Sequence, residues 1–487
     1  MNSRPIKHVS RVVLSSTARI LAVLVAAAFL ASCATMNDPA QRREMRQNFV
    51  ASTDTNVPLA AGHERVDINL SPSSKKDPLV FLTISGGGSR SAYYAACVME
   101  QLSQIQAPGS GRSLLENVRV ISTVSAGGLA ASWYLAHYDQ RHAPGFYDDF
   151  KKAMAVNLQW RAYGHMVWFP PLALQLLGSS LTRTDLLANE IEKLIWKRPE
   201  TFDDLRQKEM RASDPAPVLI LNGTVYNSGQ RLVMTNLPAR RFPTLVNENA
   251  KNIAISPKDE VIFRSLVTPL TFEDFGSDIG QFRVSQAVAA SAAYPILLAP
   301  FRLKVYKDCV PADLAGRATP ELLNSPWLHV ADGGLYENLG IDPILNMMKT
   351  VDRNQPVMMI VIEADQRMET YSVERNKSWG PFAVLMRIYD IGTLRPLLLY
   401  GDYLRRIHNE DKLKTVIVRL EGYDDHTDNL LKKIPTAFKL SKSHQEALDE
   451  AARENVQHAS DALVGYYRQL IGGGKATKPA KKYAETH

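Results

Sequence analysis

Short apolar runs with the composition of buried strands alternate along this chain with segments of helical periodicity. The runs occupy residues 79–84, 118–124, 218–221, 231–235 and 357–362. Most are apolar at nearly every position, which is typical of strands buried on both faces. Between them, residues 92–102 and 184–196 have helical patterns. This alternation predicts an α/β domain with a mostly parallel central sheet covered by helices.

The first 32 residues have the pattern of a secretory signal. Four basic residues precede an uncharged apolar run at 20–30, which is too short to span a bilayer comfortably. The sequence Leu30-Ala31-Ser32-Cys33 resembles the lipobox of bacterial lipoproteins, in which the cysteine is acylated and the signal is cut before it. The resemblance implies a lipid anchor at Cys33. Because Ala34 replaces the aspartate that retains such proteins at the inner membrane, it favours an outer-membrane location facing the periplasm.

The formal net charge of +7 comes from the two ends of the chain. The segment 1–32 holds four basic residues and no acid, and the segment 475–487 carries a net three positive charges. The body is therefore close to neutral, and the charge gives no reason to expect nucleic acid as a partner.

Composition divides the chain into five parts. They are the signal 1–32, an acylated N-terminus with a polar tether at 33–77, the main α/β domain at 78–365, a C-terminal helical extension at 366–470 packed on that domain, and a basic flexible tail at 471–487. The four lysines of the tail are either a solvated terminus or a contact for anionic headgroups.

A glycine-rich loop follows the first apolar run. It reads Ser85, Gly86, Gly87, Gly88, Ser89 and Arg90, directly before a helical pattern. Glycines at this place let backbone N–H groups converge on an anion, either a phosphate or the oxyanion of an acyl-transfer intermediate. The spacing fits neither a P-loop nor a dinucleotide fingerprint.

Two further turns carry groups for nucleophilic catalysis. Ser125, followed by Ala126 and Gly127, stands between an apolar run and a helical pattern, as a nucleophile elbow does, although Thr123 replaces its first glycine. Asp332, followed by Gly333 and Gly334, ends a later apolar run. A carboxylate there can accept the proton of a serine on a neighbouring strand end.

The order of these three motifs resembles the patatin-like phospholipases, lipid acyl hydrolases with a Ser-Asp dyad. The segment 289–295 (Ala-Ala-Ser-Ala-Ala-Tyr-Pro) and Asn338 add to the resemblance, which runs from about residue 78 to about residue 342. It implies a three-layer α/β/α patatin-like fold. It also implies a two-step hydrolysis of carboxylic esters through an acyl-serine intermediate, of phospholipase A or lysophospholipase type.

The resemblance assigns roles to individual residues. Ser125 corresponds to the nucleophile and Asp332 to the general base. Gly86, Gly87 and Gly88 correspond to the oxyanion hole, and Arg90, Gly127, Gly333 and Gly334 to supporting positions. The sequence departs from the family at Ser85, Ser91 and Gly340, where an acid, a glycine and a proline are frequent.

No cofactor is expected, because the sequence has neither a calcium loop nor a histidine pair at metal-ligand spacing. Apart from Cys33, only Cys97 and Cys309 are present, too few for a thiolate metal site, and one disulfide between them stays open. The expected partners are a phospholipid or lysophospholipid substrate and the membrane that anchors Cys33. The oligomeric state is open.

Two other functions compete with this interpretation. A Ser-His-Asp hydrolase would use a histidine after the acid, such as His408 or His444, whereas His329 precedes it. A non-catalytic lipoprotein that binds lipid or assists envelope assembly would keep the fold as a scaffold. The apolar stretches 167–177 and 379–403 suit either core helices or an acyl-chain channel.

Overall fold

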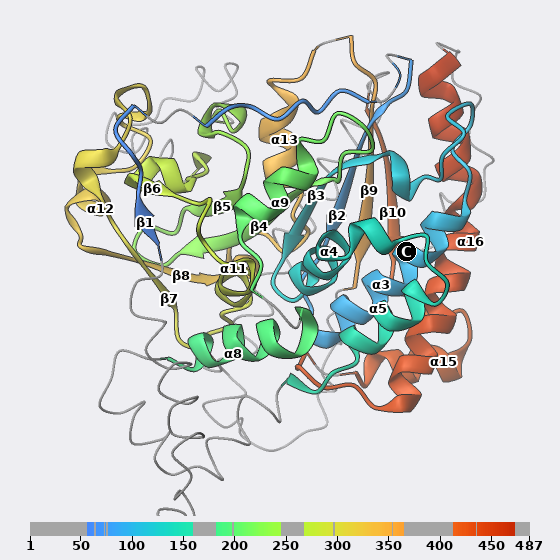
Figure 1. The fold of residues 1–487 in the computed structure, drawn as a ribbon. Helices are drawn as coiled ribbons and strands as arrows, with labels where there is room; N and C mark the ends of the chain where they lie inside the picture. Colours follow the sequence, from blue (N-terminus) through green and yellow to red (C-terminus); the bar gives the residue numbers. More distant parts are fainter. Residues whose placement is uncertain are drawn as a thin grey trace, which may run out of the picture. The chain divides into compact units, whose positions relative to one another are not determined.

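A computed structural model describes most of the chain between Asn56 and Gly472 (Figure 1). The described residues are 56–62, 65–72, 74, 76–158, 182–196, 199–244, 267–295, 298–352, 354–364, 413–434 and 436–472. All of them belong to the larger of two units, Asp54–Ala162 with Thr182–His487. The signal, Cys33, the apolar stretches 167–177 and 379–403, and the tail beyond Gly472 lie outside the described residues.

The described residues contain one eight-stranded sheet with the order β10-β9-β2-β3-β4-β8-β7, and β5 pairs with β4. The bounds are β2 Leu79–Ile84, β3 Val118–Val124, β4 Val218–Val225, β5 Arg231–Thr235, β7 Phe301–Lys304, β8 Trp327–Asp332, β9 Val357–Glu363 and β10 Leu413–Arg419. Every pairing from β10 to β4 is parallel, whereas β5, β8 and β7 join antiparallel. The predicted α/β architecture is confirmed, with a sheet that is mixed.

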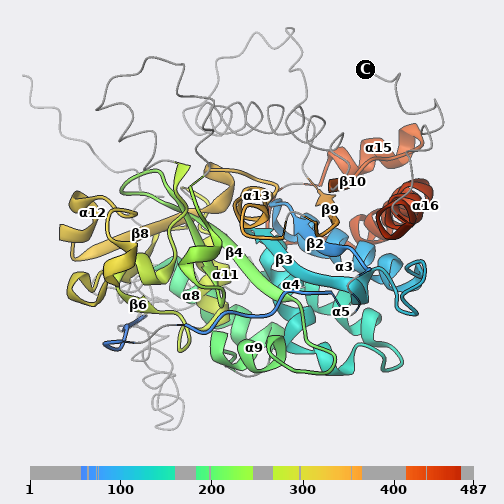
Figure 2. The same cartoon turned by 90° about the horizontal axis from the view of Figure 1, so that it is seen from above.

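Both faces of the sheet are buried, as the continuous apolar runs predict. Along β2, Val80, Leu82 and Ile84 join one core, while Leu79 and Phe81 join a second core on the other face. The first core includes residues of α3, α4, α5, α8, α11 and α16, and the second includes α13, which gives the three layers of Figure 2. Among the described residues, no helix has the length and apolar character needed to cross a membrane.

The helices have the following bounds: α3 Gly88–Gln104, α4 Gly127–Ala136, α5 Phe146–Met154, α8 Arg183–Ile191, α9 Phe202–Glu209, α11 Val284–Ser291, α12 Pro320–Asn324, α13 Asp342–Met348, α15 Asp425–Lys432 and α16 Lys442–Gly472. A short pair, β1 Val57–Pro58 and β6 Ser277–Asp278, forms a separate two-stranded sheet. The helix expected over 184–196 ends at Ile191 and continues as a π-helical turn, Glu192–Trp196.

The C-terminal extension differs from the helical segment that the sequence predicts. Within it, β10 pairs with β9 in parallel, and α16 packs on α3 and β10 (Figure 1). Of the seven residues of β10, only Leu413, Val416 and Val418 are buried. Such a half-exposed edge strand has a weaker apolar signal than the central strands. The boundary placed at residue 365 therefore cuts the sheet between two paired strands.

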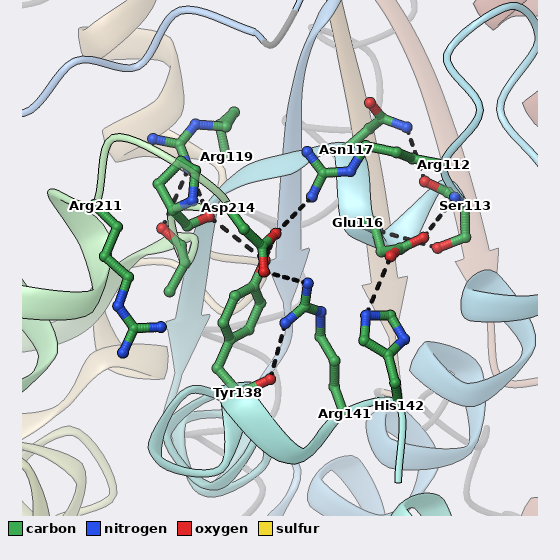
Figure 3. A network of polar contacts seen from close by, with 12 residues as sticks. Arg112, Ser113, Glu116, Asn117, Arg119, Tyr138, Arg141, His142, Arg211 and Asp214 are labelled. Atoms are coloured by element: carbon green, nitrogen blue, oxygen red, sulfur yellow. Dashed lines mark hydrogen bonds and ion pairs between the residues drawn. The ribbon is translucent and has the colours of Figure 1, made fainter.

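Asp214 forms a network of ion pairs near the amino ends of β3 and β4, at the opposite edge of the sheet from Ser125. Its carboxylate contacts Arg112 Nη2 at 3.0 Å and Arg141 Nη2 at 2.5 Å, and the Arg141 guanidinium lies 4.0 Å from the centre of the Tyr138 ring (Figure 3). Asp214 adopts φ +50°, a left-handed conformation that aspartate tolerates better than most residues. We regard this network as structural, because it brings no group to the carboxyl edge of the sheet.

Cys97 and Cys309 do not form the disulfide that the sequence leaves open. Both are free thiols: Cys97 is buried on α3, and Cys309 is half-buried in a short 3-10 helix, Lys307–Cys309. Burial raises the pKa of the Cys97 thiol well above its ordinary value, so this thiol is protonated and unreactive at neutral pH.

Candidate active site

Ser125 occupies the turn between β3 and α4 in a strained backbone conformation. Its φ of +53° lies in the left-handed region, which a residue with a Cβ rarely adopts. The Ser125 N–H donates to Ser291 Oγ at 2.9 Å, which holds the turn from α11. A Cβ on Gly127 would lie 2.8 Å from the Ser85 carbonyl oxygen, so glycine is needed where α4 begins against the loop after β2.

The carboxylate of Asp332 lies directly on the Ser125 hydroxyl. Ser125 Oγ donates to Asp332 Oδ2 at 2.8 Å, and the Gly334 N–H donates to Oδ1 at 2.7 Å. The side chain sits at the end of β8, where Asp332 pairs with Gly223 of β4. Burial raises the pKa of Asp332 to about 6, while both hydrogen bonds act in the opposite direction. At neutral pH the carboxylate is therefore ionised and able to accept a proton.

The glycine loop between β2 and α3 runs beside Ser125, and its three glycines differ in their contacts. The Gly86 N–H donates to the Asn338 carbonyl oxygen at 3.1 Å, and a Cβ on Gly86 would lie 3.3 Å from Ser125 Cβ. Among the described residues, the N–H groups of Gly87 and Gly88 have no acceptor. Of the three glycines expected to form the oxyanion hole, Gly86 thus has its N–H group bound, whereas those of Gly87 and Gly88 make no hydrogen bond within the part of the chain that the structure describes.

Arg90 does not extend into solvent from the loop. Its side chain is fully buried, and Nε donates to the Ala364 carbonyl oxygen at 2.8 Å while Nη1 donates to the Ile434 carbonyl oxygen at 2.8 Å. The supporting role implied by the resemblance is therefore one of holding backbone segments in place.

Sequence reasoning missed several residues that hold the site together. Ser291 Oγ accepts from Ser125 and donates to the Asn222 carbonyl oxygen at 2.5 Å, while Thr224 Oγ1 donates to the Asp332 carbonyl oxygen at 2.8 Å. The segment 289–295 carried a signal for Ser291, because it belonged to the resemblance. Thr224 lies within strand β4 and belongs to no motif, so nothing in the sequence indicated its contact with Asp332.

The three departures from the family pattern have local explanations. Ser85 Oγ accepts the Ala364 N–H at 2.8 Å, and Ser91 Oγ donates to the Ser85 carbonyl oxygen, so both serines brace the glycine loop. Gly340 has φ +71°, which a proline ring cannot adopt.

The histidines of the competing triad do not separate the serine from the acid. His329 lies on β8 three residues before Asp332, and His444 lies in the first turn of α16. His408 lies outside the described residues. The direct bond between Ser125 and Asp332 leaves no place for an imidazole between them.

A strained serine on a strand-to-helix turn, bonded to a buried carboxylate and next to a glycine-rich loop, is an arrangement suited to a serine hydrolase. The family model described as patatin-like phospholipase matches residues 82–345. The chain belongs to this family of lipid acyl hydrolases.

Human GIVD cytosolic phospholipase A2 is one of the solved structures similar to this chain, with 12% sequence identity and a TM-score of 0.46. The match covers 82% of this chain and 61% of the human chain. VipD from Legionella pneumophila is similar at 12% identity and a TM-score of 0.33, covering 88% of this chain and 73% of that one. This chain thus spans about three fifths of the length of the human chain. A search of curated proteins found no match to the sequence.

Proposed function

We propose that this protein is a membrane-anchored serine lipid acyl hydrolase of phospholipase A or lysophospholipase type. The observation that carries the proposal is the 2.8 Å hydrogen bond from Ser125 Oγ to Asp332 Oδ2. Because the serine is held at φ +53° and the acid is buried, the pair is fixed before a substrate arrives.

The reaction follows from the contacts of the pair. Ser125 Oγ attacks the ester carbonyl carbon as its proton passes to Asp332 Oδ2, and the N–H groups of Gly87 and Gly88 stabilise the oxyanion. The oxyanion then collapses, the ester C–O bond breaks, and the leaving alkoxide takes the proton from Asp332. In the second step a water gives a proton to Asp332 and attacks the acyl carbonyl, and Ser125 leaves with that proton.

The experiment that tests this proposal measures the release of fatty acid from phospholipid. Protein lacking residues 1–33 is incubated with mixed phospholipid vesicles, beside Ser125→Ala and Asp332→Asn variants with unchanged circular dichroism. We expect release by the parent protein and a loss of at least about 1,000-fold in both variants. If well-folded parent protein hydrolyses neither phospholipids, lysophospholipids nor simple esters, the alternative of a non-catalytic lipid-binding or envelope-assembly lipoprotein replaces this proposal.

Anchoring is the second part of the proposal. The Leu30-Ala31-Ser32-Cys33 sequence supports acylation of Cys33 and attachment to the outer membrane facing the periplasm, close to phospholipid or lysophospholipid. In bacteria labelled with palmitate, the parent chain should carry label and sediment with outer membranes, and Cys33→Ser should carry none. Label on Cys33→Ser, or parent protein in the soluble fraction, would refute the anchor without touching the hydrolase proposal.

A further inference from the structure

The connection between α15 and α16 lies against the glycine loop, although it is distant in sequence. The family match ends at residue 345, and this connection follows almost ninety residues later. Its contacts to the loop come from Ile434, Thr436 and Ala437. The region beyond the family match therefore reaches the candidate active site.

Ala437 makes a backbone-to-backbone contact with the start of α3. The Ser89 N–H donates to the Ala437 carbonyl oxygen at 2.7 Å. A Cβ on Gly88 would lie 2.6 Å from that oxygen and 2.8 Å from the Ala437 nitrogen, so a side chain at residue 88 would displace the connection. Gly88 also has φ +65°, which favours glycine independently. The two backbones are thus packed as closely as glycine permits.

Arg90 ties the same connection to the sheet. In addition to its bonds to Ala364 and Ile434, its Nη2 donates to Thr436 Oγ1 at 3.4 Å. Ala364 directly follows β9, so a single guanidinium joins α3, the end of β9 and the connection. The planar guanidinium has donors in a rigid fork, which lysine cannot reproduce.

These contacts fix the loop on both sides of its free donors. The Gly86 N–H is bound to Asn338 on one side, and the Ser89 N–H is bound to Ala437 on the other. Gly87 and Gly88, whose N–H groups would bind the oxyanion, lie between these two fixed points. A shift of the connection would therefore move the proposed donors relative to Ser125.

We propose that the α15–α16 connection is a positioning element of the catalytic site, acting through Arg90 and Ala437 on the N–H groups of Gly87 and Gly88. The inference rests on the proposed function and adds to it a requirement for sequence beyond the family match. Arg90 is a positioning residue here, since its donors contact backbone and a hydroxyl group.

The test compares kcat and KM for p-nitrophenyl butyrate in the detergent-solubilised full chain. Arg90→Lys keeps the charge and loses the fork, and we expect kcat to fall about 10- to 100-fold with KM changed less than about twofold. Ala437→Gly loosens the backbone that binds Ser89, and we expect a smaller fall in kcat. Lys439→Gln, at an exposed position of the same connection, should equal the parent.

Labelling of Ser125 by a fluorophosphonate separates positioning from folding. It counts the folded, reactive sites, and its rate should fall together with kcat in Arg90→Lys. If kcat per labelled site equals that of the parent while only the melting temperature drops, the role is structural and the inference is wrong. Should Arg90→Lys not fold, the same criteria apply to Ala437→Gly.

The parent protein distinguishes the two levels of the proposal. An active parent with an equally active, folded Arg90→Lys overturns the positioning role and leaves the hydrolase intact. A folded parent that neither hydrolyses the ester nor reacts with the fluorophosphonate overturns both.

Discussion

Ser125 Oγ and Asp332 Oδ2 are 2.8 Å apart, although 207 residues separate them in the chain. The contact arises because β3 and β8 both pair with β4. Val124 pairs with Asn222, and Asp332 pairs with the next residue, Gly223. The register of two strands on a third therefore brings the serine and the acid together.

The pH dependence of ester hydrolysis should report the titration of Asp332. Its pKa is raised to about 6 by burial, and only the ionised carboxylate can accept the Ser125 proton. We expect kcat/KM for a soluble ester to rise with pH through about 6 and to be level above it. A rising limb that moves when a histidine is replaced would instead favour a triad.

Asp332→Asn should be inactive and yet more stable than the parent at high pH. The raised pKa means that the proton on Asp332 stabilises the folded state fully below pH 3.8, and that this contribution is lost as the pH rises through about 6. The neutral amide of Asp332→Asn avoids that loss. Above pH 6 the free energy of unfolding of the variant should therefore exceed that of the parent by up to about 3 kcal/mol. Urea denaturation at pH 4 and pH 8 measures the difference, and an equal gain at both values would contradict this explanation.

Ser291→Ala should impair catalysis through the turn that carries Ser125. The change leaves the Ser125 N–H and the Asn222 carbonyl oxygen buried without their partner, which costs about 1–3 kcal/mol, and we expect kcat to fall about 10-fold or more. Ser132→Ala is the matched control, because Ser132 is also buried and its hydroxyl has no partner among the described residues. Equal effects of the two substitutions on kcat would show that Ser291 has no specific role in catalysis.

Gly333→Ala should destabilise the protein by about 1–3 kcal/mol and displace Asp332, since the added Cβ would overlap the Asn222 carbonyl oxygen. Gly465→Ala offers the reverse case on α16, where nothing lies within 4 Å of the added atom. There we expect a gain of about 0.5–1 kcal/mol. Thermal unfolding and ester hydrolysis of both variants are measured. A stable, active Gly333→Ala would show that the backbone of β4 at Asn222 can move enough to accommodate the added Cβ.

Replacement of His329, His408 or His444 by glutamine should leave kcat within about twofold of the parent, because Ser125 contacts the acid directly. The measurement is ester hydrolysis by each single variant, with Asp332→Asn as the inactive reference. A histidine variant as inactive as Asp332→Asn would establish the triad in place of the dyad.

Local sequence determined the central strands and the turns that follow them. Continuous apolar runs such as 79–84 and 118–124 must be buried on both faces, which makes them central strands, and glycines near their ends mark turns that only small residues fit. Ser125 and Asp332 were therefore recognisable at strand ends. The antiparallel attachment of β8 and the edge strand β10 were not, since pairing direction and half-exposed strands leave little trace in a local pattern.

Tertiary structure alone decided which polar groups meet. The bonds of Ser291 to the Ser125 turn, of Asn338 to Gly86 and of Arg90 to Ile434 join segments that only the packed sheet and helices bring together. The same packing sets the pKa of Asp332, because that value depends on burial by residues remote in sequence. Residue type and backbone preference act over a few residues and specify the motifs, whereas hydrogen-bond partners and burial depend on where distant segments lie.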